Sequence, residues 1–570
     1  MSRGEGIRKM NRFCSAILIM LFVLASTGCA YRQITVPEVI DSDFATAYRN
    51  DLKTLSSDEF QGRRPGTPGG KMTQEYLINS FKSMGLEPGN HGSYVQEVNL
   101  ISSKTTASGI TAVGVDGDSL KIEMNTDILP GIKGVESDLS LVNKELIFVG
   151  FGNESEKFNW HDYDEIDVEG KIVIILRNHA GFVNQDSSVL NDPANVRYGF
   201  YSTKMKTAES HGALGAIVIF DSTLSKSKYY WKQLARRASM GRNALYDGEI
   251  DSSALKLQAV LNLGIGKQLL ALAGYDYDSL VVAASTPGFK AFDLGITFNG
   301  EFTREQTIYS SNNVLALIRG AKRPDEVVIY TAHWDHLGMD EAMEGDNIFN
   351  GAADNGTGTA SILSLARAFK AQPLPPKRSI LFMGFTAEEM GLLGSKYYAD
   401  NPVFTLGKSI ASINIDMLNF GGATNDLIIY GSGKSDLDKY AERAAKKLGM
   451  RIQDDPWPEE RYYYRSDNIS LARKGLPSMS MDNGIDSREH GREWGMEYHK
   501  AFVDSNYHKV SDEYSEELNV DGIMQYLQVV FDIGYTLANS SKYPNWNKED
   551  EFRPIRDASR SKARMEKTLK

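Results

Sequence analysis

The second half of the sequence alternates between short apolar runs and longer amphipathic segments, and this alternation limits the possible folds most strongly. The runs DEVVIYTAH, RSILFMGF, SIASINID and LPSMSM are rich in β-branched and other apolar residues, as buried strands are. Segments with helical spacing, such as TASILSLARAFKA and DGIMQYLQVVFDIGYTLAN, lie between or after them. Such alternation predicts an α/β fold with a doubly wound, mostly parallel sheet.

Histidine and acidic residues recur where the predicted strands end. In a doubly wound sheet, ligands bind at the carboxyl ends of the strands. The first strand runs into AHWDH, the second into TAEE and the third into NIDM, while NGAADNG and NYHKVSD precede helices. Imidazoles and carboxylates without thiolates are the donor set that suits zinc in a hydrolytic site.

Two adjacent glutamates, Glu388 and Glu389, follow the apolar run SILFMGF. Adjacent carboxylates repel each other, so the pair has two possible interpretations. It belongs to a solvated loop, or the two side chains have different tasks, one holding a metal and the other moving protons.

The N-terminus is typical of an export signal over residues 1–29. Basic residues precede the apolar run AILIMLFVLA, which is shorter than the roughly 20 residues needed to span a membrane. The following STGC resembles a bacterial lipobox, although Ser26 stands where leucine is usual. We therefore expect an exported protein, anchored in the cell envelope, at the outer membrane or in the periplasm, by a lipid on Cys29. Ordinary cleavage nearby and an uncleaved anchor are the alternatives.

Composition excludes several functional classes. The formal net charge is −11 and no basic run with interleaved aromatic residues occurs, which argues against nucleic-acid binding. The two cysteines, Cys14 and Cys29, both lie in the export signal. The rest of the chain therefore has no internal disulfide, no catalytic thiol and no thiolate metal ligand.

The length of 570 residues indicates two or three domains. Residues 106–305 have a β-rich, glycine-punctuated texture and are expected to form an inserted α+β domain. Residues 46–105 and 306–542 would then form the main domain together. Residues 543–570 are charged and poor in apolar residues, and they are expected to form a loose polar tail.

The motifs AHWDHLG, NGAADNGTG, FTAEEMGLLGS, NIDM and YHKVSD together resemble one family. They are similar to the di-zinc exopeptidases that include secreted bacterial aminopeptidases, glutamate carboxypeptidase and the transferrin receptor. The segment SSDEFQGRRPGTPGG resembles the N-terminal part of that family. FVGFGNE and DYDEIDVEGKIVIIL resemble the protease-associated domain that is often inserted in it.

The resemblance implies two Zn²⁺ ions per chain. His333 and Asp416 would hold one ion, Glu389 and His508 would hold the other, and Asp354 would bridge them.

It also implies three catalytic roles. Glu388 would be the general base, and Asp335 would hydrogen-bond His333 and fix its tautomer. Tyr507 would donate to the developing oxyanion. Three further histidines, His336, His490 and His499, are expected at the pocket rim or surface.

The expected activity is that of a metallo-aminopeptidase acting on peptides. The alternatives are a carboxypeptidase, a glutaminyl cyclase that uses one zinc ion, and a non-catalytic receptor, which would lack the metal ligands. Whether the enzyme cleaves at the N-terminus or the C-terminus of the peptide depends on the pocket, because binding a C-terminal carboxylate requires a cationic side chain. The candidates near the pocket in sequence are Arg461, Arg465, Arg488 and Arg492. The oligomeric state and the side-chain preference stay open.

Overall fold

The computed structural model describes residues 34–568, apart from 185, 187–188, 191–197, 222–229 and 250–252. The export signal expected over residues 1–29, including Cys29, lies outside the described residues. Among the helices that are described, none combines the length and the apolar character needed to cross a membrane.

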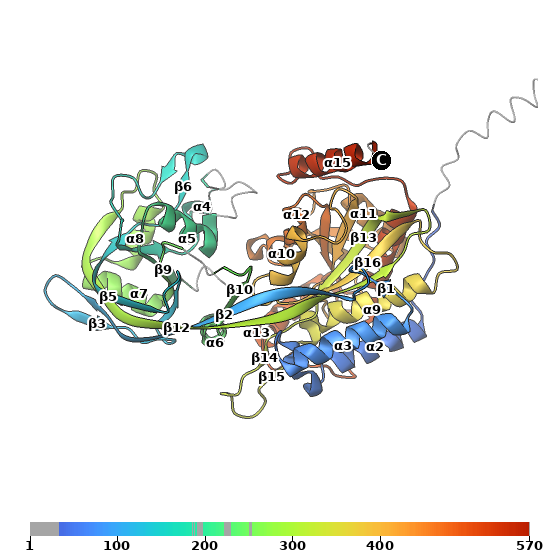
Figure 1. Ribbon diagram of the computed structural model, residues 1–570, viewed down its shortest axis with the longest axis horizontal. Helices are drawn as coiled ribbons and strands as arrows, with labels where there is room; N and C mark the ends of the chain where they lie inside the picture. The colour runs from blue at the N-terminus through green and yellow to red at the C-terminus, as the bar shows by residue number, and fades with distance from the viewer. Residues whose placement is uncertain are drawn as a thin grey trace, which may run out of the picture.

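The chain forms two lobes joined by a long antiparallel ribbon (Figure 1). The ribbon consists of β2 (Val95–Val113) and β12 (Phe292–Ile318), which pair along nearly the whole length of β2. Each lobe has its own buried apolar cluster. The cluster of the larger lobe includes Leu52, Phe81, Tyr330, Ile362 and Phe531, and that of the smaller lobe includes Ile110, Phe148, Ile174, Ile219 and Phe302.

The larger lobe contains the predicted α/β sheet, with strand order β19-β18-β20-β17-β13-β16-β12. Its strands are β13 (Arg323–His333), β16 (Arg378–Phe385), β17 (Ser409–Asn414), β18 (Asp426–Tyr430), β19 (Arg451–Asp454) and β20 (Ser478–Asp482). Strands β16, β13, β17 and β20 are parallel neighbours, whereas β12 and β18 pair antiparallel with them. The prediction of a mostly parallel sheet with helices is therefore confirmed.

Helices cover both faces of this sheet, because its central strands are buried on both sides. The even-numbered residues Val328 and Tyr330 of β13 face one cluster, and Val327 and Ile329 face another. The first face packs against α2 (Ser42–Leu55), α3 (Pro68–Ser83), α9 (Thr357–Lys370), α11 (Asp438–Lys447) and α14 (Asp521–Asn539). The second face packs against α10 (Leu393–Asp400) and α12 (Asn468–Ala472).

The smaller lobe has a sheet of its own that continues from the ribbon. Its strands β5 (Asp138–Phe148), β8 (Ile172–Leu176), β9 (Gly215–Phe220) and β11 (Leu257–Asn262) are parallel, and β4 (Ile128–Ile132) pairs antiparallel at the edge. Helices α5 (Tyr201–Ser210), α7 (Leu263–Leu272) and α8 (Tyr277–Ala284) lie beside it (Figure 1).

Between β9 and β11 the chain forms two elements outside the smaller lobe's sheet. Helix α6 (Tyr230–Ser239) lies between the lobes, and β10 (Arg242–Leu245) pairs with β2 of the ribbon (Figure 1).

The expectation of a loose tail was wrong. Residues 543–568 end in helix α15 (Arg553–Thr568), and the side chains of Trp546, Phe552 and Arg556 in this segment are buried. Trp546 and Phe552 pack together, and the guanidinium of Arg556 donates to the carbonyls of Leu406 and Ser409. Few apolar residues are therefore enough to dock the tail, because one buried arginine satisfies main-chain acceptors at the edge of the larger lobe.

Candidate functional site

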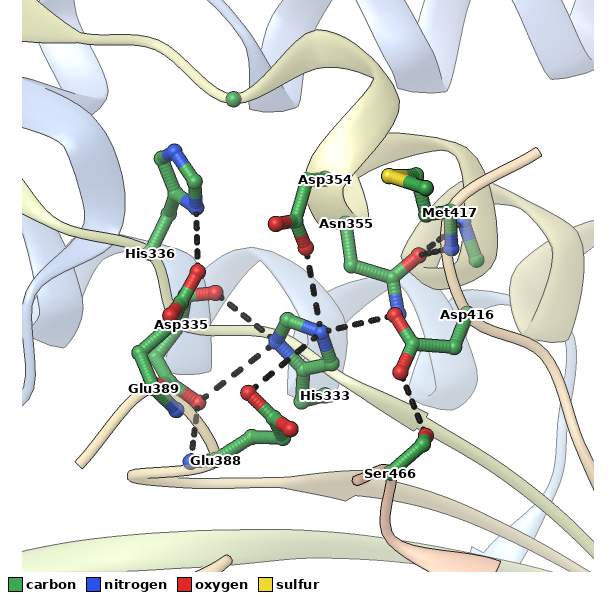
Figure 2. A network of polar contacts seen from close by, with 12 residues as sticks. His333, Asp335, His336, Asp354, Asn355, Glu388, Glu389, Asp416, Met417 and Ser466 are labelled. Atoms are coloured by element: carbon green, nitrogen blue, oxygen red, sulfur yellow. Dashed lines mark hydrogen bonds and ion pairs between the residues drawn. The ribbon is translucent and has the colours of Figure 1, made fainter. Parts of the chain in front are cut away.

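The carboxyl ends of the parallel strands bring together His333, Asp335, Glu388, Glu389 and Asp416 (Figure 2). His333 is the last residue of β13 and is paired in register with Phe385, the last residue of β16, after which Glu388 and Glu389 follow. Asp416 follows β17 in the same way. Asp354 and His508 arrive from two turns: the short π-helical turn Ala352–Gly356 before α9, and the turn after α13 (Gly491–Ser505).

The five predicted metal ligands form two groups that share Asp354. His333 Nε2 lies 3.1 Å from Asp416 Oδ1 and 3.4 Å from Asp354 Oδ1. His508 Nε2 lies 3.0 Å from Asp354 Oδ2 and 3.1 Å from Glu389 Oε1. Asp354 thus presents one carboxylate oxygen to each histidine.

His336 was expected at the pocket rim but is fully buried beside the second group. Its Nδ1 lies 3.0 Å from Glu389 Oε1, and burial lowers the pKa of the His336 imidazole. Among the described residues, neither ring nitrogen of His336 nor Glu389 Oε1 finds a partner with hydrogen-bond geometry. Buried polar atoms without partners are costly, and an ion at this position would engage Glu389 Oε1 and one of the two ring nitrogens of His336.

The donor atoms fit a metal. In the described part of the chain, His333, Asp354 and Asp416 form one group that could share an ion, and His336, Asp354 and Glu389 form another. Imidazole nitrogens and carboxylate oxygens are the ligands of catalytic zinc.

Asp335 contacts His333 through its main-chain carbonyl and not through its carboxylate. His333 Nδ1 lies 3.0 Å from the main-chain carbonyl oxygen of Asp335, whereas the nearer carboxylate oxygen is 3.9 Å away. The carboxylate instead accepts hydrogen bonds from the backbone N–H groups of Glu388, at 3.0 Å, and Glu389, at 3.3 Å. The carbonyl therefore fixes the His333 tautomer, leaving Nε2 for a ligand, and the carboxylate fixes the turn with the two glutamates.

The two adjacent glutamates have opposite proton affinities. Burial raises the pKa of Glu388 well above its ordinary value, although His333 opposes this. Burial also acts to raise the pKa of Glu389, but His508, His336 and Arg237 together hold it well below the ordinary value. Glu388 thus binds a proton more readily than its neighbour Glu389, which stays charged as a metal ligand must.

The turn carrying Asp354 is tied to its surroundings by two side chains. The carboxylate of Asp512 accepts hydrogen bonds from the N–H groups of Ala353, at 2.9 Å, and Asp354, at 3.1 Å. The side chain of Asn355 accepts from Met417 N–H and donates to the carbonyl of Ile415. The shared aspartate and the loop of Asp416 are therefore fixed relative to each other.

Arg63 is a structural residue of the site that sequence reasoning missed. Its side chain is fully buried, and its guanidinium donates to the main-chain carbonyls of Leu55, Trp334, Asn350 and Gly351. These bonds join the N-terminal segment to the loops that follow β13 and precede α9. The segment SSDEFQGRRPGTPGG therefore stabilises the loops around the site through Arg63 without contributing a ligand.

A pocket opens beside the candidate ligands. Besides the residues of the site it is lined by Met417, Tyr430, Tyr462, Arg465, Ser466, Ser480 and Tyr507. The Tyr507 ring stacks on His508 with centroids 3.8 Å apart, and burial raises the pKa of its hydroxyl, which therefore stays protonated.

The four candidate arginines differ in whether they line the pocket. Arg465 lines the pocket, whereas Arg488 donates to the carbonyls of Thr424 and Leu448, and Arg492 donates to Gln453. Arg461 faces the smaller lobe near Gly199. His499 stacks on Trp457, and His490 is at the surface.

The sequence is similar to those of known proteins. The sequence model of Peptidase family M28 matches residues 313–533. A probable glutamate carboxypeptidase, AMP1 of Arabidopsis thaliana, is 25% identical over 394 residues, which are 64% of this chain and 51% of the relative. The chain thus spans about half of the length of that relative. A probable lipoprotein aminopeptidase, LpqL of Mycobacterium tuberculosis, is 23% identical over 540 residues, covering 88% of this chain and 90% of the relative.

The fold also occurs among solved structures. An aminopeptidase from Aneurinibacillus sp. strain AM-1 superposes with a TM-score of 0.51 at 19% identity, covering 88% of this chain and 95% of the other. All eight predicted site residues lie within residues 313–533, the part of the chain that matches the family model. Residues 313–533, which contain the candidate site, are similar to peptidase family M28.

Proposed function

We propose that this protein is a zinc-dependent exopeptidase, an aminopeptidase that removes N-terminal residues from peptides. The observation that carries this proposal is the shared aspartate: Asp354 faces His333 with one oxygen and His508 with the other. A carboxylate placed between two histidine–carboxylate pairs suits a pair of ions. The family match and the relatives named as aminopeptidases support the same activity.

The proposed ligands are His333 and Asp416 for one ion, Glu389 and His508 for the other, and Asp354 for both. Two zinc ions held there would lower the pKa of a water molecule and polarise the scissile carbonyl.

The protein's own side chains would carry out the remaining steps. Glu388 lines the pocket with its side chain 12% exposed, so substrate and water reach it. We assign it the task of taking the proton of the attacking water and passing it to the leaving amine. Tyr507, protonated and in the same pocket, would donate a hydrogen bond to the oxyanion that forms on the substrate.

A carboxypeptidase is the second candidate, and one specific observation favours it. Arg465 lines the pocket and would suit a terminal carboxylate. A purely binding protein is less compatible with the site, because such a protein has no need for five ligand-type residues and a buried general base.

The location and domain division are also proposals. A lipid on Cys29 would anchor the exported chain in the cell envelope, and the relative named as a lipoprotein supports this. Residues 106–305 would form an inserted domain of the protease-associated type, which is consistent with the separate apolar cluster of the smaller lobe.

Mass spectrometry of three matched peptides, incubated with the zinc-loaded protein, tests the proposed activity. One peptide has both ends free, one is N-acetylated and one is C-amidated. Stepwise N-terminal loss that acetylation blocks is the expected result. Loss from the C-terminus that amidation blocks would establish the carboxypeptidase instead, and loss of ammonia from N-terminal glutamine would indicate cyclisation.

A further inference from the structure

Helix α6 connects the smaller lobe with the metal site of the larger lobe. At its start, Trp231 packs against Phe220 of β9 in the smaller lobe, with ring centroids 6.1 Å apart. Further along, the side chains of the same helix contact the larger lobe, and Figure 1 shows the helix lying between the two.

Three residues of α6 make these contacts. Arg237 Nη2 donates to Glu389 Oε2 at 2.7 Å and lies 3.2 Å from His508 Nδ1. Gln233 Nε2 donates to the main-chain carbonyl of Tyr507 at 3.4 Å. The guanidinium of Arg236 lies 3.7 Å from the ring centroid of Phe349. One helix therefore touches a proposed ligand, the turn that holds another ligand, and a strand beside the site.

The two oxygens of the Glu389 carboxylate have different partners. Oε1 faces His508 Nε2 at 3.1 Å and His336 Nδ1 at 3.0 Å, whereas Oε2 is held by Arg237. The Glu389 side chain is 5% exposed and that of Arg237 is 39% exposed, so the carboxylate end of this charge-assisted hydrogen bond is buried. With Oε2 bound to Arg237, Oε1 is the oxygen of Glu389 that faces His508 and His336.

The other half of the site is supported differently. Asp416 directs Oδ1 at His333, and its Oδ2 accepts a hydrogen bond from Ser466, which belongs to the larger lobe. Glu389 and Asp416 thus each have an outer partner, but the partner of Glu389 comes from α6, which packs against the smaller lobe through Trp231.

We propose that Arg237 is a positioning residue through which the smaller lobe supports the Glu389–His508 half of the metal site. The inference rests on the proposed function, which assigns Glu389 and His508 as ligands. Removing an outer partner of a metal ligand typically costs about 10–100-fold in metal affinity. The effect is expected at this half, because Arg237 contacts Glu389 and His508, whereas Ser466 donates to Asp416.

Two other roles for Arg237 predict different results. If the residue only joined the lobes, its loss would weaken both halves of the site equally. If its positive charge mainly repelled the ion, its loss would tighten zinc binding. The affinity of each half, measured separately, therefore distinguishes positioning from both.

The test uses the full chain with Arg237→Gln and measures zinc binding by competition with a chromophoric chelator. One site should weaken by about 10–100-fold while the other is unchanged. Arg237→Lys should recover part of the loss, because lysine keeps the charge but not the planar fork. Lys232→Gln, at an exposed position of the same helix, is the matched control and should bind zinc like the wild type.

A double-mutant cycle identifies the half concerned. In a Glu389→Gln background, Arg237→Gln should have no effect on the remaining His333–Asp416 site, because Arg237 supports only the other half. Two unchanged sites, two equally weakened sites, or a tightened site would overturn the inference. A wild-type protein that binds no zinc would instead refute the proposed function, and the inference with it.

Discussion

Exchanging the two adjacent glutamates for glutamine, one at a time, should separate proton transfer from metal binding. Glu388→Gln keeps the shape of the side chain and the backbone N–H bond to Asp335. Its carboxylate lies 4.0 Å from His333 Nε2, farther than the 3.1 Å of Asp416 and the 3.4 Å of Asp354. Zinc content should therefore be unchanged.

The loss of activity follows from the role of the general base. A positioned proton-transfer group contributes about 10²–10⁴-fold in rate. At about 1.4 kcal/mol per factor of ten, the barrier rises by about 3–5 kcal/mol. The turnover number should fall by this factor, while the apparent affinity for the peptide changes little.

Glu389→Gln is the matched variant, one residue away in the same turn. Its Oε1 lies 3.1 Å from His508 Nε2, and its Oε2 binds Arg237. The substitution removes a ligand charge, so the affinity of one zinc site should fall by at least about 10–100-fold, the loss typical of a mere outer partner.

The assay combines zinc analysis of the dialysed proteins with the initial rate of hydrolysis of an unblocked peptide. The expected pattern is full zinc with little activity for Glu388→Gln, and reduced zinc for Glu389→Gln. A Glu388→Gln variant with near-normal turnover, or one that loses zinc while Glu389→Gln keeps it, would refute the division of roles.

Three further predictions concern stability. Arg63→Met should lower the free energy of unfolding by at least about 3 kcal/mol in urea denaturation, because four main-chain carbonyls lose a buried donor; a loss below about 1 kcal/mol would contradict this. Trp546→Ala should speed hydrogen exchange in α15 relative to α14, since it empties a buried position; equal exchange in wild type and variant would show that Trp546 does not dock the tail. Burial lowers the pKa of Lys204 to about 7, below its unfolded value, so stability should rise from about pH 7 to 10 and Lys204→Met should flatten that rise; parallel profiles would contradict it.

Sequence alone was sufficient for the strands and for the grouping of ligand-type residues. Strand β13 was predicted from DEVVIYTAH, and it ends at His333 as expected. Because parallel strands end at one edge of a sheet, residues far apart in the chain, such as His333 and Asp416, meet there.

Features that depend on tertiary contacts could not be predicted in this way. Which atom of Asp335 faces His333 depends on backbone geometry that the motif AHWDH does not specify. The Arg237–Glu389 contact joins positions 152 residues apart through a helix whose sequence has no motif for it. The docking of the tail depends on the burial of Arg556, which composition marks as a surface residue.

The number of zinc ions bound per chain tests the central claim most directly. Metal-free full-length protein is titrated with zinc, and the bound metal is counted by elemental analysis, for the wild type, Asp416→Asn and Asp354→Asn. Two ions in the wild type, one in Asp416→Asn and weakened binding at both positions in Asp354→Asn are predicted. One ion in the wild type, or an Asp354→Asn variant that loses affinity at a single position, would contradict a pair of ions sharing Asp354.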